Sequence, residues 1–417
     1  MTALRDYVHN IKKFSPQARL YLFVSVLQGV GWGIFQLFFN FYILSLGYQR
    51  DFLGMLISIP PMTAIVMALF AGYISDLIGR KRAFIFGNIV TVIAQAMMLL
   101  WPTSTMLILA GILRGAGQSL FRVTASPFLM ENSTEAERTH LFSFSSGLRT
   151  LASFLGNFLG GGLPALFGNF LGVSATDSLA YAWSLGITTM LTTLTLIPLS
   201  RLKVQTRVMA QSPLAPFKAL WQHRRMMTRL LLPSLVLSLG AGMLIPFLNV
   251  FFRFRYNLSD DTIGALFGFG SLGMGFALMM GPVLAERWGK PKTVVITQGL
   301  SIPFLIILGF VHSLTLAYVA FFVRMALMNL AGPVYQTMVM EEADAEARGM
   351  AASLYSLIWS SGRALSPVIS GPVQEAYGFD PVFLSTILAY TLSVGMVYWW
   401  FVRGRRRRRS AQPLLNA

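Results

Sequence analysis

The second half of this 417-residue chain repeats the first half at a constant interval of 210 positions. Glycines and charged residues mark the repeat, and no gap is needed to keep its register. The pairs are Asp51/Asp261, Gly54/Gly264, Asp76/Glu286, Gly79/Gly289, Arg80/Lys290, Arg82/Lys292, Arg114/Arg324, Glu131/Glu341, Arg138/Arg348 and Gly161/Gly371. Solenoid repeats are much shorter, about 20–50 residues. We therefore interpret the chain as an internal duplication of one unit of about half its length.

Between these charged pairs lie apolar runs of about 20 residues, the length that crosses a bilayer as a helix. Hydrophobic residues make up 55% of the chain and charged residues 12%, whereas soluble domains carry roughly 25% charged residues. In lipid a helix satisfies its own backbone hydrogen bonds. The sequence therefore predicts an all-α polytopic membrane protein. The first run, at 20–46, is too long for a cleaved signal peptide and is expected to be a retained span.

Twelve spans fit the apolar runs, six in each half. They are expected at 20–46, 52–74, 83–101, 105–130, 139–166, 179–199, 230–252, 262–285, 293–311, 314–339, 350–372 and 381–402. Six spans per half insert both halves the same way up, so we expect two six-helix bundles related by a pseudo-two-fold axis along the membrane normal. The predicted parts are an N-terminal bundle at 1–199, a basic linker at 200–229, a C-terminal bundle at 230–402 and a basic tail at 403–417.

The distribution of cations predicts the orientation of the chain. Of its 33 Lys and Arg residues, we place 25 on one side of the membrane, three on the other and five inside spans. Because cytoplasmic loops are enriched in Lys and Arg, we expect a multi-pass protein of the plasma (cytoplasmic) membrane, or cell inner membrane, with both termini cytoplasmic. The arginine run at 405–409 is interpreted as an anchor at an anionic leaflet, so no nucleic-acid partner is expected.

One loop motif occurs in both halves. The two copies read Gly72-Tyr-Ile-Ser-Asp76-Leu-Ile-Gly79-Arg80-Lys81-Arg82 and Pro282-Val-Leu-Ala-Glu286-Arg-Trp-Gly289-Lys290-Pro-Lys292. Each places an acidic residue at the cytoplasmic end of a span, a glycine for a tight turn, and then cations. The carboxylate can cap a neighbouring helix or pair with an arginine. We expect such contacts to latch the outward-open state, although the motif is also compatible with orientation signals alone.

The segment Asp76-x-x-Gly79-Arg80-Lys81 resembles the signature loop of the major facilitator superfamily, and the chain is similar to that family along essentially its whole length. Leu77 stands where the family usually has a basic residue. The segment at 156–161 is similar to the family's antiporter motif, with Asn157 in place of its proline. The resemblance implies a set of gate and motif residues, which are Gly72, Asp76, Gly79, Arg80, Arg82 and Glu131, with the counterparts Glu286, Gly289, Lys290 and Glu341.

Five arginines lie within apolar runs, namely Arg114, Arg122, Arg149, Arg324 and Arg363. Each costs roughly 2.5–3.5 kcal/mol at mid-span, so each should face water or a polar partner. All 16 acidic residues fall in loops or at span ends by our placement. In one hypothesis an anionic group of the substrate supplies the counter-charge, since arginine grips carboxylate or phosphate in bidentate fashion. In the other, the arginines hold the bundle together through carbonyl and amide groups.

Ten polar residues at membrane depth are the candidates for substrate binding. They are Arg149, Arg363, Arg114, Arg324, Gln28, Gln36, Asn40, Asn249, Asn329 and Gln336. We favour a bundle-holding role for Arg114 and Arg324, and leave both roles open for Arg149 and Arg363, which lie near the expected midplane.

These features favour a secondary transporter that moves a small organic solute, anionic in one hypothesis, by alternating access of the two bundles. The alternative is an efflux antiporter for amphipathic drugs, suggested by the antiporter-like segment and by the 33 Phe and 22 Met residues.

An enzyme is not expected, because the chain has four scattered His and no Cys from which to build a nucleophile–base pair or a metal cluster. We expect no cofactor and no metal. The expected partners are a small-molecule substrate, the bilayer and a coupling ion. We expect the protein to be a monomer. The substrate, the direction of transport and the ion stay open.

Overall fold

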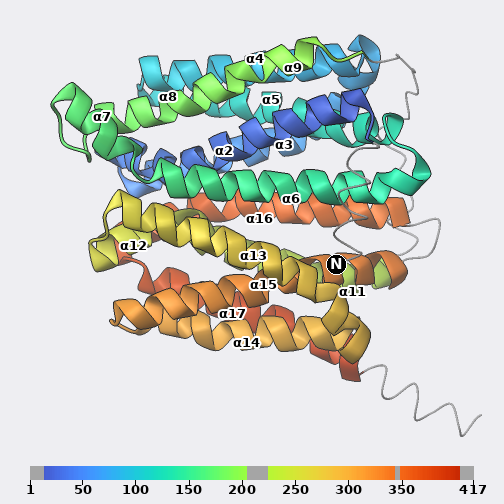
Figure 1. Cartoon of the computed structure of the whole chain (residues 1–417). Helices are drawn as coiled ribbons and strands as arrows, with labels where there is room; N and C mark the ends of the chain where they lie inside the picture. The colour runs from blue at the N-terminus through green and yellow to red at the C-terminus, as the bar shows by residue number, and fades with distance from the viewer. Residues whose placement is uncertain (1–13, 204–223, 343–347, 404–417) are drawn as a thin grey trace, which may run out of the picture. The chain divides into compact units, whose positions relative to one another are not determined.

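The computed structural model describes residues 14–203, 224–342 and 348–403. Most of the linker expected at 200–229 and nearly all of the tail expected at 403–417 lie outside the described residues. The described part is helical with short connections (Figure 1). This confirms the predicted all-α fold.

The helices of the two halves follow each other in the same order. In the first half they are α2 (Pro16–Ser45), α3 (Arg50–Ile78), α4 (Arg80–Leu100), α5 (Ser104–Glu131), α6 (Glu135–Gly160), α7 (Leu163–Leu171), α8 (Ser178–Leu194) and α9 (Leu196–Ser200). In the second half they are α11 (Arg224–Leu244), the 3-10 turn η1 (Ile245–Phe247), α12 (Leu248–Tyr256), α13 (Asp260–Trp288), α14 (Lys290–Phe310), α15 (Leu314–Glu342), α16 (Arg348–Tyr377), α17 (Asp380–Val397) and the π-helix η3 (Tyr398–Arg403).

Within the described ranges, eleven helical segments are long and apolar enough to cross a membrane. Each of them coincides with an expected span. The remaining expected span, at 350–372, is also a helix, α16, but it lies outside those eleven. Several serines and Arg363 lower its mean hydropathy.

Three expected spans are interrupted, which the apolar runs did not predict. The span expected at 139–166 breaks at Gly161 and Gly162 into α6 and α7, because glycine is a poor helix former. The span expected at 179–199 is divided at Thr195 into α8 and α9. The span expected at 230–252 contains η1, where Pro246 has no N–H to donate to the helix ladder.

The chain forms two compact units by its contacts. The described residues of unit 1 are 14–49, 59–203 and 252–271, and those of unit 2 are 50–58, 224–251, 272–342 and 348–403. Each unit therefore contains a short piece of the other half of the sequence. These pieces are the start of α3 in unit 2, and the end of α12 with the first part of α13 in unit 1. The domain boundaries expected at 199 and 230 stay a prediction.

The packing inside each unit follows the repeat. In unit 1, α2 packs on α6 and α8, and α4 packs on α5 and α8. In unit 2, α11 packs on α16 and α17, and α14 packs on α15 and α17. These four pairs of contacts correspond one to one under the 210-residue interval.

Paired glycines lie where the start of α3 packs in unit 2 and where the start of α13 packs in unit 1. A Cβ on Gly54 would lie 2.2 Å from the Pro367 carbonyl oxygen and 3.1 Å from Gly371 Cα, so α3 touches α16 inside unit 2. A Cβ on Gly264 would lie 2.7 Å from the Asn157 carbonyl oxygen of α6 and 2.7 Å from Cα of Gly161, which follows α6, so α13 touches the end of α6 inside unit 1. Gly54 and Gly264 are repeat mates, as are Gly161 and Gly371. These four positions of the repeat thus encode one helix contact made twice.

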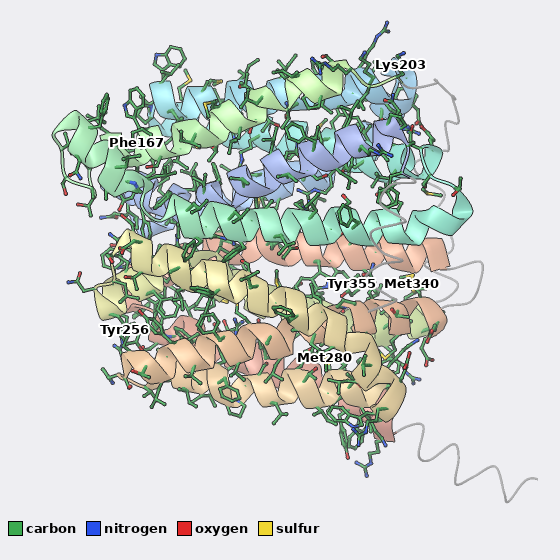
Figure 2. The ribbon with its side chains drawn as sticks, in the orientation of Figure 1. Phe167, Lys203, Tyr256, Met280, Met340 and Tyr355 are labelled. Atoms are coloured by element: carbon green, nitrogen blue, oxygen red, sulfur yellow. The ribbon has the colours of Figure 1, made fainter. Side chains whose placement is uncertain are left out.

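The two ends of unit 1 can be told apart by their residues. Figure 2 shows Phe167, in α7, and Lys203, after α9, at opposite ends of this unit. The Lys203 backbone N–H donates to Gln17 Oε1 at 2.8 Å, so the start of α2 meets the chain beyond α9 at the Lys203 end. The cation distribution predicts that this end is cytoplasmic.

Candidate functional site

The first loop motif forms a charged cluster at the junction of α3 and α4. Arg80 Nη1 lies 2.6 Å from Asp76 Oδ1 and donates to Ser75 Oγ at 2.9 Å, while Arg80 Nε lies 3.4 Å from Glu131 Oε1 at the end of α5. Gly79 has φ +85°, a left-handed conformation that favours glycine. The structure therefore brings together three predicted gate residues, Asp76, Arg80 and Glu131. Gly72 instead faces Val123, whose Cγ1 would lie 3.9 Å from a Cβ at position 72, and Arg82 is exposed.

The second loop motif repeats this geometry only in part. Gly289 has φ +82°, close to the value of its mate Gly79. Lys290 forms an ion pair with Glu341 at the end of α15. Glu286, however, is exposed and has no ion pair within the described ranges. Lys290 therefore binds one carboxylate where Arg80 binds two.

Arg114 is buried in α5 against aromatic rings of α2. Its side chain is 6% exposed, and its guanidinium carbon lies 3.5 Å from the centroid of the Phe35 ring and 5.8 Å from that of Trp32. The Nε atom is buried without a hydrogen-bond partner. Trp32 itself is 47% exposed. Arg114 thus adds positive charge beneath an accessible aromatic surface.

Arg324, the repeat mate of Arg114, has different neighbours. It is 2% exposed in α15 and donates through Nη2 to the hydroxyl oxygen of Tyr390, in α17, at 3.1 Å. This contact ties two helices of unit 2 together. The geometry is typical of the bundle-holding role that the sequence favoured for both residues.

Arg149 and Arg363 are exposed on α6 and α16 respectively, each within its own unit. Neither guanidinium has an ion pair or hydrogen bond to the part of the chain that the structure describes. Both groups are therefore accessible to a ligand or to water.

Some of the neutral candidate residues have accessible side chains, and the others are buried or hydrogen-bonded within the protein. Gln28 is half-buried and Gln36 is exposed, and they flank Trp32 at intervals of four residues along α2. Gln336 is exposed on α15. Asn40 and Asn249 are buried, and Asn329 donates to the Met325 carbonyl of its own helix at 2.8 Å. The accessible polar surface of unit 1 thus includes one side of α2, where Gln28, Trp32 and Gln36 lie in line.

A second charged cluster, which the sequence did not reveal, lies at the other end of unit 1. Asp260, in the first turn of α13, forms an ion pair with Arg253 of α12 and accepts a hydrogen bond from the Tyr181 hydroxyl at 3.0 Å. The Arg253 guanidinium lies 4.4 Å from the Phe41 ring centroid. Tyr181 and Phe41 come from distant α8 and α2, so no local sequence pattern could have indicated the cluster.

The described residues contain no group of three or more His, Asp or Glu placed to hold a metal ion. The described side chains at the candidate sites offer ionic, aromatic and hydrogen-bonding contacts. The two charged clusters lie at helix ends, whereas Arg114, Arg149, Arg324 and Arg363 lie within helices.

Comparison with known proteins agrees with these features. A family model described as the Major Facilitator Superfamily matches residues 21–367 and, in a second match, residues 230–415. The quinolone resistance protein NorA of Staphylococcus aureus (strain MSSA476) is 21% identical over 369 residues, which cover 84% of this chain and 92% of that protein.

Two solved structures have a similar fold. The nucleoside transporter NupG superposes with a TM-score of 0.73 at 15% identity, covering 93% of this chain and 99% of that chain. A D-xylose-proton symporter superposes with a TM-score of 0.74 at 14% identity, covering 92% and 97%. At these identities the likeness concerns the fold alone.

Proposed function

Because the chain belongs to the major facilitator superfamily and is therefore a multi-pass secondary transporter rather than an enzyme, we propose that it exports amphipathic organic compounds across the plasma membrane. This was the alternative that the sequence left open beside the anionic solute. The relative named for quinolone resistance favours it, since the alignment with that protein covers 92% of its length.

The observation that carries this proposal is the exposed side chain of Trp32 in unit 1, beneath which the buried Arg114 lies against the buried ring of Phe35. Polar side chains at membrane depth should face water rather than lipid, so Gln28 and Gln36 assign that side of α2, with Trp32, to a wet surface. An exposed indole offers a stacking face to an aromatic ligand, and a few polar groups beside it fix the orientation of that ligand. Such a surface suits molecules with an aromatic body and a polar group.

A thermal-shift screen of the purified protein tests this proposal, because a ligand that binds the folded state raises its melting temperature. We expect amphipathic aromatic compounds to stabilise the protein and sugars to leave it unchanged. Trp32→Leu should abolish the shift. Trp183→Leu is the matched control, since Trp183 in α8 is similarly exposed, at 52%. Stabilisation by sugars alone, or equal shifts in both variants, would contradict the proposal.

A second candidate function is transport of an organic anion, supported by the accessibility of Arg149 and Arg363. Guanidinium groups that make no ion pair or hydrogen bond to the described residues can bind a carboxylate or phosphate in bidentate fashion. We expect Arg149→Gln and Arg363→Gln each to weaken the binding of anionic compounds and to spare neutral ones. If both variants bind every anionic ligand as well as the parent does, this candidate function is excluded.

Orientation and assembly complete the proposal. The positive-inside distribution supports cytoplasmic termini, and the two repeated halves support alternating access. We propose that the transporter works as a monomer coupled to an ion gradient. Single cysteines near the termini of this naturally Cys-free chain should react with impermeant reagents from the cytoplasmic side alone.

A further inference from the structure

We propose that Asp260 is a proton-binding site, and that its charge keeps the turn between α12 and α13 docked on α2 and α8. The proposal rests on the proposed function in one respect, namely that proton entry would drive export. It concerns a carboxyl group that the loop motifs and the buried arginines leave out.

Asp260 is placed to respond to a single proton. Its side chain is 9% exposed. One carboxylate oxygen, Oδ1, pairs with Arg253 Nη2, and the other, Oδ2, accepts the Tyr181 hydroxyl. Both oxygens are thus occupied by donors that favour the charged form. A proton on the carboxylate would remove the ionic partner of Arg253, which would keep the Tyr181 hydroxyl at 3.5 Å from Nη1 and the Phe41 ring.

The surroundings of Asp260 contain few other charges. The charged groups that act on it are Arg253 of α12 and the neighbouring Asp261 of α13, and Tyr181 is the titratable group from α8. From α2 the apolar ring of Phe41 covers the guanidinium of Arg253. Arg253 Nε is buried and has no hydrogen-bond partner. The carboxylate of Asp260 is therefore the group that neutralises Arg253 here.

The ion pair joins distant parts of the sequence within unit 1. Arg253 and Asp260 flank the turn at 257–259, whereas Phe41 and Tyr181 belong to the first half of the chain. Tyr181 lies in the first turn of α8, and the cluster therefore belongs to the end of unit 1 that carries α7 and Phe167. The cation distribution assigns that end to the outside.

The sign of the pH effect follows from this geometry. At neutral pH the charged carboxylate holds Arg253 and the turn stays docked. At acidic pH a proton from the external water binds a carboxylate oxygen, the carboxylate becomes a neutral acid, and Arg253 remains cationic without its ionic partner. Acid on the outer side should therefore loosen the turn, and neutral pH should restore the docked turn.

Infrared difference spectra of the substrate-free full chain in lipid nanodiscs, recorded between acidic and neutral pH, report the protonated carboxyl directly. We expect one component of the carboxyl band to be lost in Asp260→Asn and kept in the matched control Asp261→Asn. Tyr181→Phe should make that component appear at higher pH, because the hydroxyl that favours the charged form is gone. A band unchanged in Asp260→Asn would overturn the proton site.

A distance measurement tests the docking and covers the case in which Asp260→Asn does not fold. Spin labels at Thr176→Cys and Ser259→Cys, both exposed in unit 1, should move apart on acidification of the otherwise unaltered chain. The longer distance should be present at both pH values in Asp260→Asn, while Asp261→Asn should follow the parent. A distance that does not depend on pH in the parent would overturn the latch.

Neither measurement uses a substrate. Loss of the predicted drug export together with an intact infrared component and an intact distance change would leave the proton site standing. The opposite result, export without either signal, would overturn the proton site alone.

Discussion

The guanidinium of Arg114 lies against the ring of Phe35, with 3.5 Å between the guanidinium carbon and the ring centroid. A cation over an aromatic face is stabilised by about 2 kcal/mol when desolvated. The repeat mate, Arg324, instead bonds to the Tyr390 hydroxyl. The two halves of the chain therefore accommodate the same buried charge in different ways. From this difference we expect Arg114 to contribute to ligand binding and Arg324 to contribute to the stability of the fold.

We predict that Arg114→Met abolishes ligand-induced stabilisation while leaving the melting temperature equal to or above that of the parent. Burying a cation without a carboxylate is costly, so an apolar side chain of similar length should be tolerated. Thermal unfolding with and without an amphipathic aromatic compound measures both effects. A variant that melts well below the parent would show that Arg114 has a bundle-holding role.

Arg324→Met should behave in the opposite way. It leaves the buried Tyr390 hydroxyl without its hydrogen-bond partner, which costs about 1–3 kcal/mol. We expect a lower melting temperature and unchanged ligand shifts in whatever protein folds. Tyr390→Phe is the control, because it removes the same bond from the other side. Loss of ligand binding at full stability would contradict the structural role.

The paired glycine contacts should be intolerant of a methyl group. Gly264→Ala places a Cβ 2.7 Å from the Asn157 carbonyl oxygen, and overpacking of this kind costs about 1–3 kcal/mol. Gly273→Ala is the control in the same helix, since nothing lies within 4 Å of its Cβ. Melting temperatures should fall for Gly264→Ala and stay or rise for Gly273→Ala. Equal values would argue against a close contact between α13 and α6.

Asp76→Asn should disable the loop latch. The substitution removes the carboxylate 2.6 Å from Arg80, and a loss of about 1.4 kcal/mol corresponds to a tenfold change in an equilibrium. We expect a bias towards the inward-open state, measured by labelling of single cysteines from each side. Glu286→Gln is the matched control, because this repeat mate has no ion pair in the described structure. Unchanged labelling in Asp76→Asn would count against the latch.

The repeat allowed much of the fold to be predicted. Gly79 and Gly289 both adopt positive φ, as expected for the turns of the loop motif. Each described acidic residue lies in a loop or within the first or last three residues of its helix, as the placement of the spans predicted. These features depend on local sequence, which is why they could be recognised without a structure.

Contacts between distant segments were not predictable in the same way. The repeat mate of Phe35 is Ile245, in the turn η1, and the repeat mate of Tyr390 is Ala180. Arg114 and Arg324 therefore contact aromatic residues at positions that the repeat does not relate, although their own positions repeat. The pairing of Asp260 with Tyr181 depends on tertiary packing across 79 positions. Side-chain contacts of this kind can be identified only from the three-dimensional arrangement of the helices.

Transport of a fluorescent amphipathic dye by the purified protein in liposomes, driven by an imposed proton gradient, tests the central claim most directly. We predict that the parent protein moves the dye faster than empty liposomes do, that Arg114→Met does not, and that a sugar is not transported. Dye movement no faster than in empty liposomes, in a preparation whose protein is folded and correctly inserted, would contradict the account.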